Sequence, residues 1–221
     1  MSLQSIQLRK LLKLGFASPS LRTSDLRDDI RAELRKIAGV KEDGNDFYLS
    51  FWADAKGHVY GSHDLHTATE GRIADNWRRK NLYPRLRDGF LLWWNERRRW
   101  TNAPFEPGPS LRGSYEIPEL CALIKIDNIM SVRDGLGVDR FVYPYFAPEP
   151  EMTDDAARLA LWMLGRALPD VPHHEIRILD VIRGRTFSID RIPLLGDEEV
   201  RLRQMYETLV RERETLRKGY D

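Results

Sequence analysis

The sequence contains a single cysteine, Cys121, among its 221 residues. One cysteine excludes a disulfide bond within the chain, which is compatible with a reducing compartment. Cys121 stands in the apolar run of residues 120–124, where a free cysteine usually serves as a small buried side chain. We therefore predict a buried and unreactive thiol.

Long apolar runs and an excess of charge of one sign are also absent. No stretch approaches the roughly 18 consecutive apolar residues of a membrane span. Residues 1–16 carry leucines at helical spacing, but they lack the apolar core and the cleavage site of a signal peptide. The formal net charge of +1 gives no overall field that favours nucleic acid or a membrane. We expect a soluble, cytoplasmic protein without a membrane partner, in an oligomeric state that the sequence leaves open.

Common catalytic and metal-binding motifs are missing as well. The segment Gly135-Leu136-Gly137 is too short for a phosphate-binding loop and joins strands instead of opening a helix. His63 and His66 have a spacing that is possible for a metal pair, but no second pair of ligands follows them. We expect solvated loop histidines, and the motifs alone predict no certain cofactor.

The first half of the sequence has the periodicity of helices. Apolar residues spaced by three and four predict helices over residues 3–14, 24–39, 47–60, 65–80 and 84–100. Ser24 and Asp25 are expected to cap the second of these helices, and Pro84 suits the first position of the last one. Prolines and glycines in residues 101–113 then predict a linker or a long loop.

The residue pattern of the second half is typical of a sheet with flanking helices. It predicts strands over residues 115–117, 120–132 and 140–146, a helix over 153–168, a strand over 176–182, a hairpin strand over 186–189 and a helix over 197–218. Thr153 is expected to cap its helix, and Pro144 argues for an edge strand or a bulge. The predicted class is α+β, with a helical N-terminal half followed by a mixed or antiparallel sheet. We divide the chain into a helical region of residues 1–80 and an α/β domain of residues 81–221, with one continuous domain as the alternative.

The element order from residue 84 to residue 182 resembles the αβββαβ core of the PD-(D/E)xK nuclease superfamily. In that family an acid on the second strand and an E-x-K-like triplet on the third strand hold Mg²⁺ and position the attacking water. Asp127 stands where the first acid, a metal ligand, would lie. The third strand, residues 141–146, has neither carboxylate nor lysine, so the resemblance implies a catalytic site only with substitutes. The nearby candidates are Glu116, Lys125 and Asp139.

Basic and aromatic residues are interleaved in residues 72–100. Cations contact phosphates and indoles stack on bases, so this composition is typical of a nucleic-acid-binding surface. The residues predicted to bind nucleic acid are Arg78, Arg79, Lys80, Arg97, Arg98 and Arg99. The alternative is that the tryptophans belong to the core and the arginines form a solvated face. Phe90, Trp93 and Trp94 share the apolar stripe of the predicted helix and favour that alternative.

Three hypotheses for function follow from these patterns. The first is a non-catalytic nucleic-acid-binding or regulatory protein on a degraded nuclease-like scaffold. The second is a nuclease centred on Asp127, which would use Mg²⁺. The third is a protein-interaction partner, such as an immunity or accessory subunit, that uses exposed aromatic residues around Tyr143-Pro144-Tyr145. Whether the protein is an enzyme is left open by the sequence.

Overall fold

The structure is a computed structural model that describes residues 3–40 and 47–220. Its α-helices are α1 (Leu8–Phe16), α2 (Pro19–Ile37), α3 (Phe47–Val59), α4 (Leu65–Asp75), α5 (Tyr83–Leu92), α6 (Asp154–Ala167) and α7 (Glu198–Arg217). Its strands are β1 (Ser5–Gln7), β2 (Glu106–Pro107), β3 (Gly113–Ile117), β4 (Ala122–Ile126), β5 (Met130–Arg133), β6 (Asp139–Tyr145), β7 (Ile176–Asp180) and β8 (Arg185–Phe187). The predicted α+β class is confirmed.

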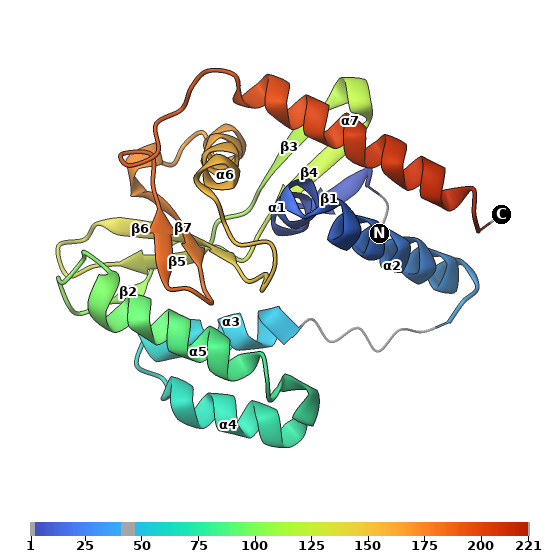
Figure 1. Ribbon diagram of the computed structural model, residues 1–221. Helices are drawn as coiled ribbons and strands as arrows, with labels where there is room; N and C mark the ends of the chain where they lie inside the picture. Colours follow the sequence, from blue (N-terminus) through green and yellow to red (C-terminus); the bar gives the residue numbers. More distant parts are fainter. Residues whose placement is uncertain (1–2, 41–46, 221) are drawn as a thin grey trace.

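The strands form two mixed sheets with helices around them (Figure 1). The smaller sheet has the order β1-β4-β3, with β1 parallel and β3 antiparallel to β4. The larger sheet has the order β2-β5-β6-β7-β8, in which only β6 and β7 are parallel. Helix α6 connects this parallel pair, as a crossover connection requires.

Both faces of the larger sheet are buried. Successive side chains of a strand point to opposite faces, and apolar side chains occupy both. Phe141 and Tyr143 of β6 belong to the core that includes α1, α6 and α7. Val142 of the same strand belongs to the core that includes α3 and α5. Both cores therefore contain elements from before and after residue 81. None of the helices within residues 3–40 and 47–220 is long and apolar enough to cross a membrane.

The N-terminal elements differ from the prediction in two places. Residues 5–7 form a strand instead of the start of a helix, because pairing with β4 satisfies their backbone groups. Helix α2 begins at Pro19, earlier than predicted, and its cap is Ser18 instead of Ser24. The Ser18 hydroxyl accepts the backbone N–H of Leu21, and proline at the first helical position has no N–H of its own that needs a partner.

The strand predicted over residues 120–132 is two strands that belong to different sheets. Asn128 has a φ of 62°, and the chain passes there from β4 of the smaller sheet to β5 of the larger one. Cys121, just before β4, is exposed with a φ of 48°, so the predicted burial of its thiol is wrong. The apolar pattern of residues 120–132 gives no signal of the left-handed backbone at Cys121 and Asn128.

Pro144 lies in a central strand, so the predicted edge position is wrong. The carbonyl of Tyr145 accepts the backbone N–H of Val181 on the continuation of β7, so the backbone polar groups of Tyr145 point toward that strand. The backbone nitrogen of its neighbour Pro144 points to the opposite side, toward β5. The ladder with β5 ends at the pair of Met130 and Val142. The missing N–H of proline therefore lies beyond Met130, the first residue of β5, and breaks no hydrogen bond of this ladder.

Helix α5 packs against the turn between β7 and β8 through two glycines. A Cβ added at Gly89 would lie 2.2 Å from the carbonyl oxygen of Val181 and 2.3 Å from that of Ile182. A Cβ added at Gly184, whose φ is 57°, would lie 2.6 Å from the carbonyl oxygen of Gly89. Both positions therefore need glycine. This contact places the carboxyl end of α5 beside the β7–β8 hairpin.

The substitution Gly89→Ala tests this contact. Alanine is the better helix former, by roughly 1 kcal/mol, but its methyl group would press on backbone that cannot move aside freely. We expect a net loss of about 1–3 kcal/mol in the free energy of unfolding, measured by urea denaturation. The matched control is Gly71→Ala in α4, where no atom lies within 4 Å of the added Cβ. That control should be as stable as the wild type or more stable, and equal effects of the two substitutions would contradict the packing described.

Candidate functional site

Asp127, the predicted metal ligand, lies in the connection between β4 and β5 and is held by amide groups. Its carboxylate accepts hydrogen bonds from the Gln7 side chain at 3.0 Å and from the Asn128 side chain at 2.6 Å. The Lys56 ammonium is near enough that Asp127 raises its pKa, although burial has the larger effect and lowers it. Asp127 is thus tied to β1 and faces a cation from α3.

The third strand of the predicted nuclease-like core presents tyrosines with structural hydrogen bonds. The Tyr143 hydroxyl accepts the backbone N–H of Arg9 at 3.0 Å, and the Tyr145 hydroxyl donates to the carbonyl of Pro150 at 2.8 Å. Both side chains are buried, and burial raises the pKa of each phenol. The prediction of exposed aromatic residues at 143–145 is therefore wrong, because β6 is covered on both faces.

The other three catalytic candidates do not converge with Asp127. Glu116 and Lys125 are exposed side chains of the smaller sheet. Asp139 makes a bidentate ion pair with Arg133, with both contacts at 2.9 Å. This pair closes one end of the β5–β6 ladder, and Asp127 precedes the other end. Within the described ranges, no three His, Cys, Asp or Glu side chains are placed to hold a metal ion together.

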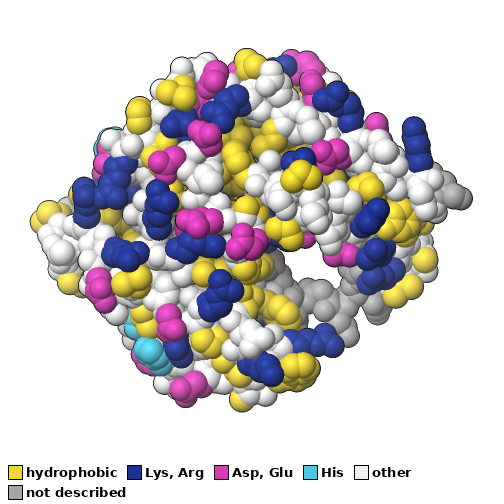
Figure 2. Space-filling model, viewed as in Figure 1, with side chains coloured by type: hydrophobic (Ala, Val, Ile, Leu, Met, Phe, Trp, Pro, Cys, Tyr) yellow, Lys and Arg dark blue, Asp and Glu magenta, His cyan; other side chains and the backbone are white. Residues whose placement is uncertain are grey.

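Arginine side chains from separate segments meet beside the carboxyl end of α5. We name this set the arginine basin: Arg97, Arg99, Arg177, Arg185 and Arg191. It lines two adjoining hollows, an inner one of about 80 Å³ and an outer one of about 430 Å³. Arg177 lines only the inner hollow, Arg185 lines only the outer one, and the other three line both. Figure 2 shows basic side chains, with acidic ones among them, over this part of the molecule.

The end of α5 determines where its arginines point. The helix continues into a π-helical turn, Trp93–Arg97, in which the N–H of Arg98 donates to the carbonyl of Trp93 at 2.8 Å. The Arg97 guanidinium donates to the carbonyls of Arg183 and Gly184 at 3.0 and 3.2 Å. Arg98 has extended backbone, so its side chain points to one side and the side chains of Arg97 and Arg99 point to the other. Arg97 and Arg99 therefore lie toward the hairpin.

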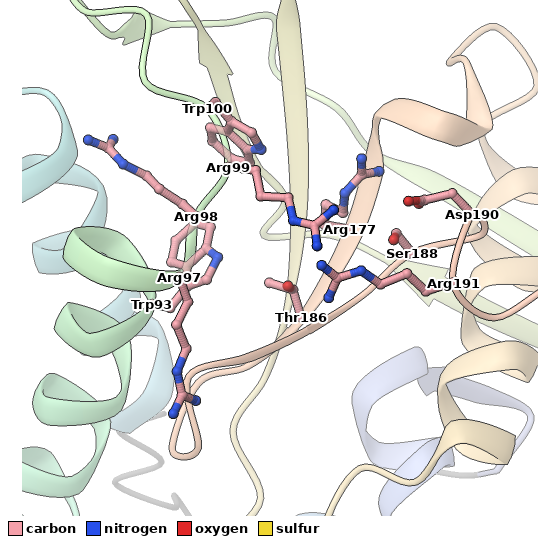
Figure 3. Close-up of a pocket in the computed structure, with 10 residues that line it drawn as sticks. All are labelled: Trp93, Arg97, Arg98, Arg99, Trp100, Arg177, Thr186, Ser188, Asp190 and Arg191. Carbon is pink, nitrogen blue, oxygen red and sulfur yellow. The ribbon is translucent and has the colours of Figure 1, made fainter.

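Arg98 points away from the inner hollow and packs on aromatic rings (Figure 3). Its guanidinium carbon is 3.7 Å from the centroid of the Trp94 ring and 4.4 Å from that of Phe105. These distances are typical of a stacked cation–π contact. Burial lowers the pKa of Arg98, which nevertheless remains protonated at neutral pH. Its role is to hold the chain after α5 against the core.

Arg177 reaches the inner hollow from β7. Its neighbours in the strand, Ile176 and Ile178, are buried in the core on the other face of the sheet. The guanidinium donates to the carbonyl of Ile176 at 3.0 Å. Burial lowers the pKa of Arg177, the carboxylates of Asp190 and Glu175 oppose this shift, and the nearby Arg191 adds to it. Repulsion between these guanidinium groups favours an anion between them.

Few carboxylates balance this charge. Asp190 lines the inner hollow, and a hydrogen bond from the Ser188 hydroxyl lowers the pKa of its carboxyl group. Asp154 lines the outer hollow and pairs with Arg185 at 2.9 Å. Among the described residues, Arg99 and Arg191 make no ion pair. The guanidinium groups of Arg99, Arg177 and Arg191 approach one another in Figure 3, so the hollow has an excess of positive charge.

The basin contains only part of the predicted nucleic-acid-binding set. Arg97 and Arg99 belong to it. Arg79 is buried instead, and its guanidinium donates to the carbonyl of Arg72 at 3.1 Å. Lys80 lies over the ring of Trp77, 5.1 Å from its centroid. Arg78 is exposed on the 3-10 turn that follows α4, before the amino end of α5.

Three arginines of the basin were missed by the sequence analysis. Arg177 carried a usable signal, because it is a charged residue between two apolar ones in a predicted strand. Arg185 and Arg191 carried none, since their approach to Arg99 depends on the packing of α5 against the hairpin.

Comparisons of the chain with protein-family models, with curated proteins and with solved structures gave no match. The function is therefore inferred from the residues and their arrangement.

Excess positive charge in the basin predicts stabilisation by polyvalent anions. At equal ionic strength, sodium sulfate should raise the melting temperature more than sodium chloride, by about 2–4 °C once the site is saturated. Sulfate also stabilises proteins by exclusion from their surface, so a variant control is needed. The difference should shrink in Arg191→Gln and persist in Arg211→Gln, which changes an exposed arginine of α7. The same sulfate effect in all three proteins would show that the basin binds no anion.

Proposed function

We propose that this protein binds nucleic acid through the arginine basin and does not cleave it. The observation that carries the proposal is the approach of Arg99, Arg177 and Arg191 from three segments. Among the described residues, Asp190 is the one acidic side chain that lines their hollow. Arginine suits this role because its planar fork binds two phosphate oxygens at once. The net charge of +1 hides this local excess.

The shape of the basin favours a chain of phosphates over a single small anion. The outer hollow shares Arg97, Arg99 and Arg191 with the inner one and is about five times larger. Successive phosphates of one strand can therefore contact shared arginines. Trp93 and Trp100 also line the inner hollow, but both are buried in the core and offer no open ring face for stacking. Binding would depend on the phosphates and would tolerate different base sequences.

The non-catalytic part of the proposal is supported by the surroundings of Asp127. Its carboxylate accepts two amide hydrogen bonds, and Tyr143 and Tyr145 occupy the strand where the resemblance to PD-(D/E)xK nucleases implies an acid and a lysine. The basin itself lies elsewhere, beside α5 and the β7–β8 hairpin. We therefore assign binding to the basin and no hydrolytic step to Asp127.

Fluorescence anisotropy with a labelled single-stranded oligonucleotide tests the proposal. We expect binding at low salt, with log K falling by about 0.7 per contacted phosphate for each unit of log salt concentration. Arg99→Ala should weaken binding of every sequence and lower this slope by about one contact. The matched control, Arg211→Ala, should bind as the wild type does.

Two results would contradict the proposed function. One is no measurable affinity for single-stranded or duplex oligonucleotides at low salt. The other is cleavage of the oligonucleotide in the presence of Mg²⁺ by the wild type but not by Asp127→Ala, which would restore the hypothesis of a nuclease.

A further inference from the structure

The inner hollow differs from the outer one in its walls. It is the smaller and more enclosed of the two, at about 80 Å³ against about 430 Å³. Its walls include Trp93 and Ser188, which are both buried. A phosphodiester inside a strand carries a nucleoside on each side and needs an open groove. A small enclosed hollow suits a group with only one connection to the rest of the ligand.

The charges at the inner hollow match one kind of phosphate better than another. Arg99, Arg177 and Arg191 approach one another there, and Asp190 carries the opposing charge (Figure 3). Together with Arg97, which also lines this hollow, these groups have a net charge of three positive units. A phosphate monoester carries about −1.5 to −2 at neutral pH, whereas a phosphodiester carries one negative charge. The monoester is therefore the better complement.

We propose that the inner hollow binds the terminal phosphate monoester of a nucleic-acid strand, and that the outer hollow binds the phosphodiester next to it. This inference rests on the proposed function. Arg177 contacts only the terminal group, because it lines only the inner hollow. Arg185 contacts only the continuing strand, because it lines only the outer one. The Thr186 hydroxyl lines both hollows and donates to phosphate oxygens.

The test compares oligonucleotides of one sequence that carry a 5′-phosphate, a 3′-phosphate or no terminal phosphate. We expect the wild type to bind one of the phosphorylated forms about tenfold more tightly than the form without phosphate. Arg177→Gln should abolish this preference and keep the salt-dependent binding. Arg185→Gln should weaken binding of all three oligonucleotides and keep the preference.

The fold of Arg177→Gln is checked by its melting temperature, since the side chain bonds to backbone carbonyls. Should it unfold, Asp190→Asn takes its place, because Asp190 is exposed and lines the same hollow. Loss of its negative charge should increase the preference for the phosphorylated end several-fold. An unchanged preference would count against the inference.

The remaining outcomes separate the two proposals. Equal affinity of the wild type for all three oligonucleotides would overturn recognition of the strand end and leave nucleic-acid binding intact. Absence of binding to any of them would overturn the proposed function. A free nucleoside monophosphate serves as competitor, and we expect it to compete weakly, because it lacks the second phosphate. Competition as strong as that of the phosphorylated oligonucleotide would identify a free nucleotide as the ligand and contradict binding of a strand.

Discussion

The contact between Gly89 of α5 and the backbone of the β7–β8 turn determines where the arginine basin forms. A side chain at Gly89 or at Gly184 would overlap with backbone atoms of the other element, so the helix and the turn approach as closely as two main chains can. Arg97 strengthens the contact by donating to two carbonyls of the turn. The next arginine that faces the hairpin, Arg99, thereby comes close to Arg177, which is distant from it in the sequence.

The basin brings side chains of like charge close together. Arg98 is held by aromatic rings and Arg97 by carbonyls, whereas Arg99 and Arg191 have no ion pair within the described part of the chain. Repulsion among exposed cations costs stability, and structures usually retain such a conflict where it serves binding. Asp190 offsets part of the charge. Binding of an anion therefore lowers the electrostatic free energy of the site.

Local signals in the sequence predicted much of the fold and little of the site. Thr153 caps α6 as predicted, because a cap depends on neighbouring residues alone. The break at Asn128 and the central place of Pro144 depend on which strands pair, which no local pattern records. The same limit applies to the basin. Arg99 stands in a visibly basic segment, but its approach to Arg191 is set by the packing of distant elements.

The most direct test of the account follows the arginine side chains themselves during a titration of isotopically labelled protein with a short phosphorylated oligonucleotide. The Nε–Hε signals in the NMR spectrum report on each guanidinium group separately. The account predicts that the signals of Arg99, Arg177 and Arg191 shift together as the ligand binds, while that of Arg211 stays in place. Shifts at Arg78 with no change at those three arginines would place the binding surface elsewhere and contradict the account.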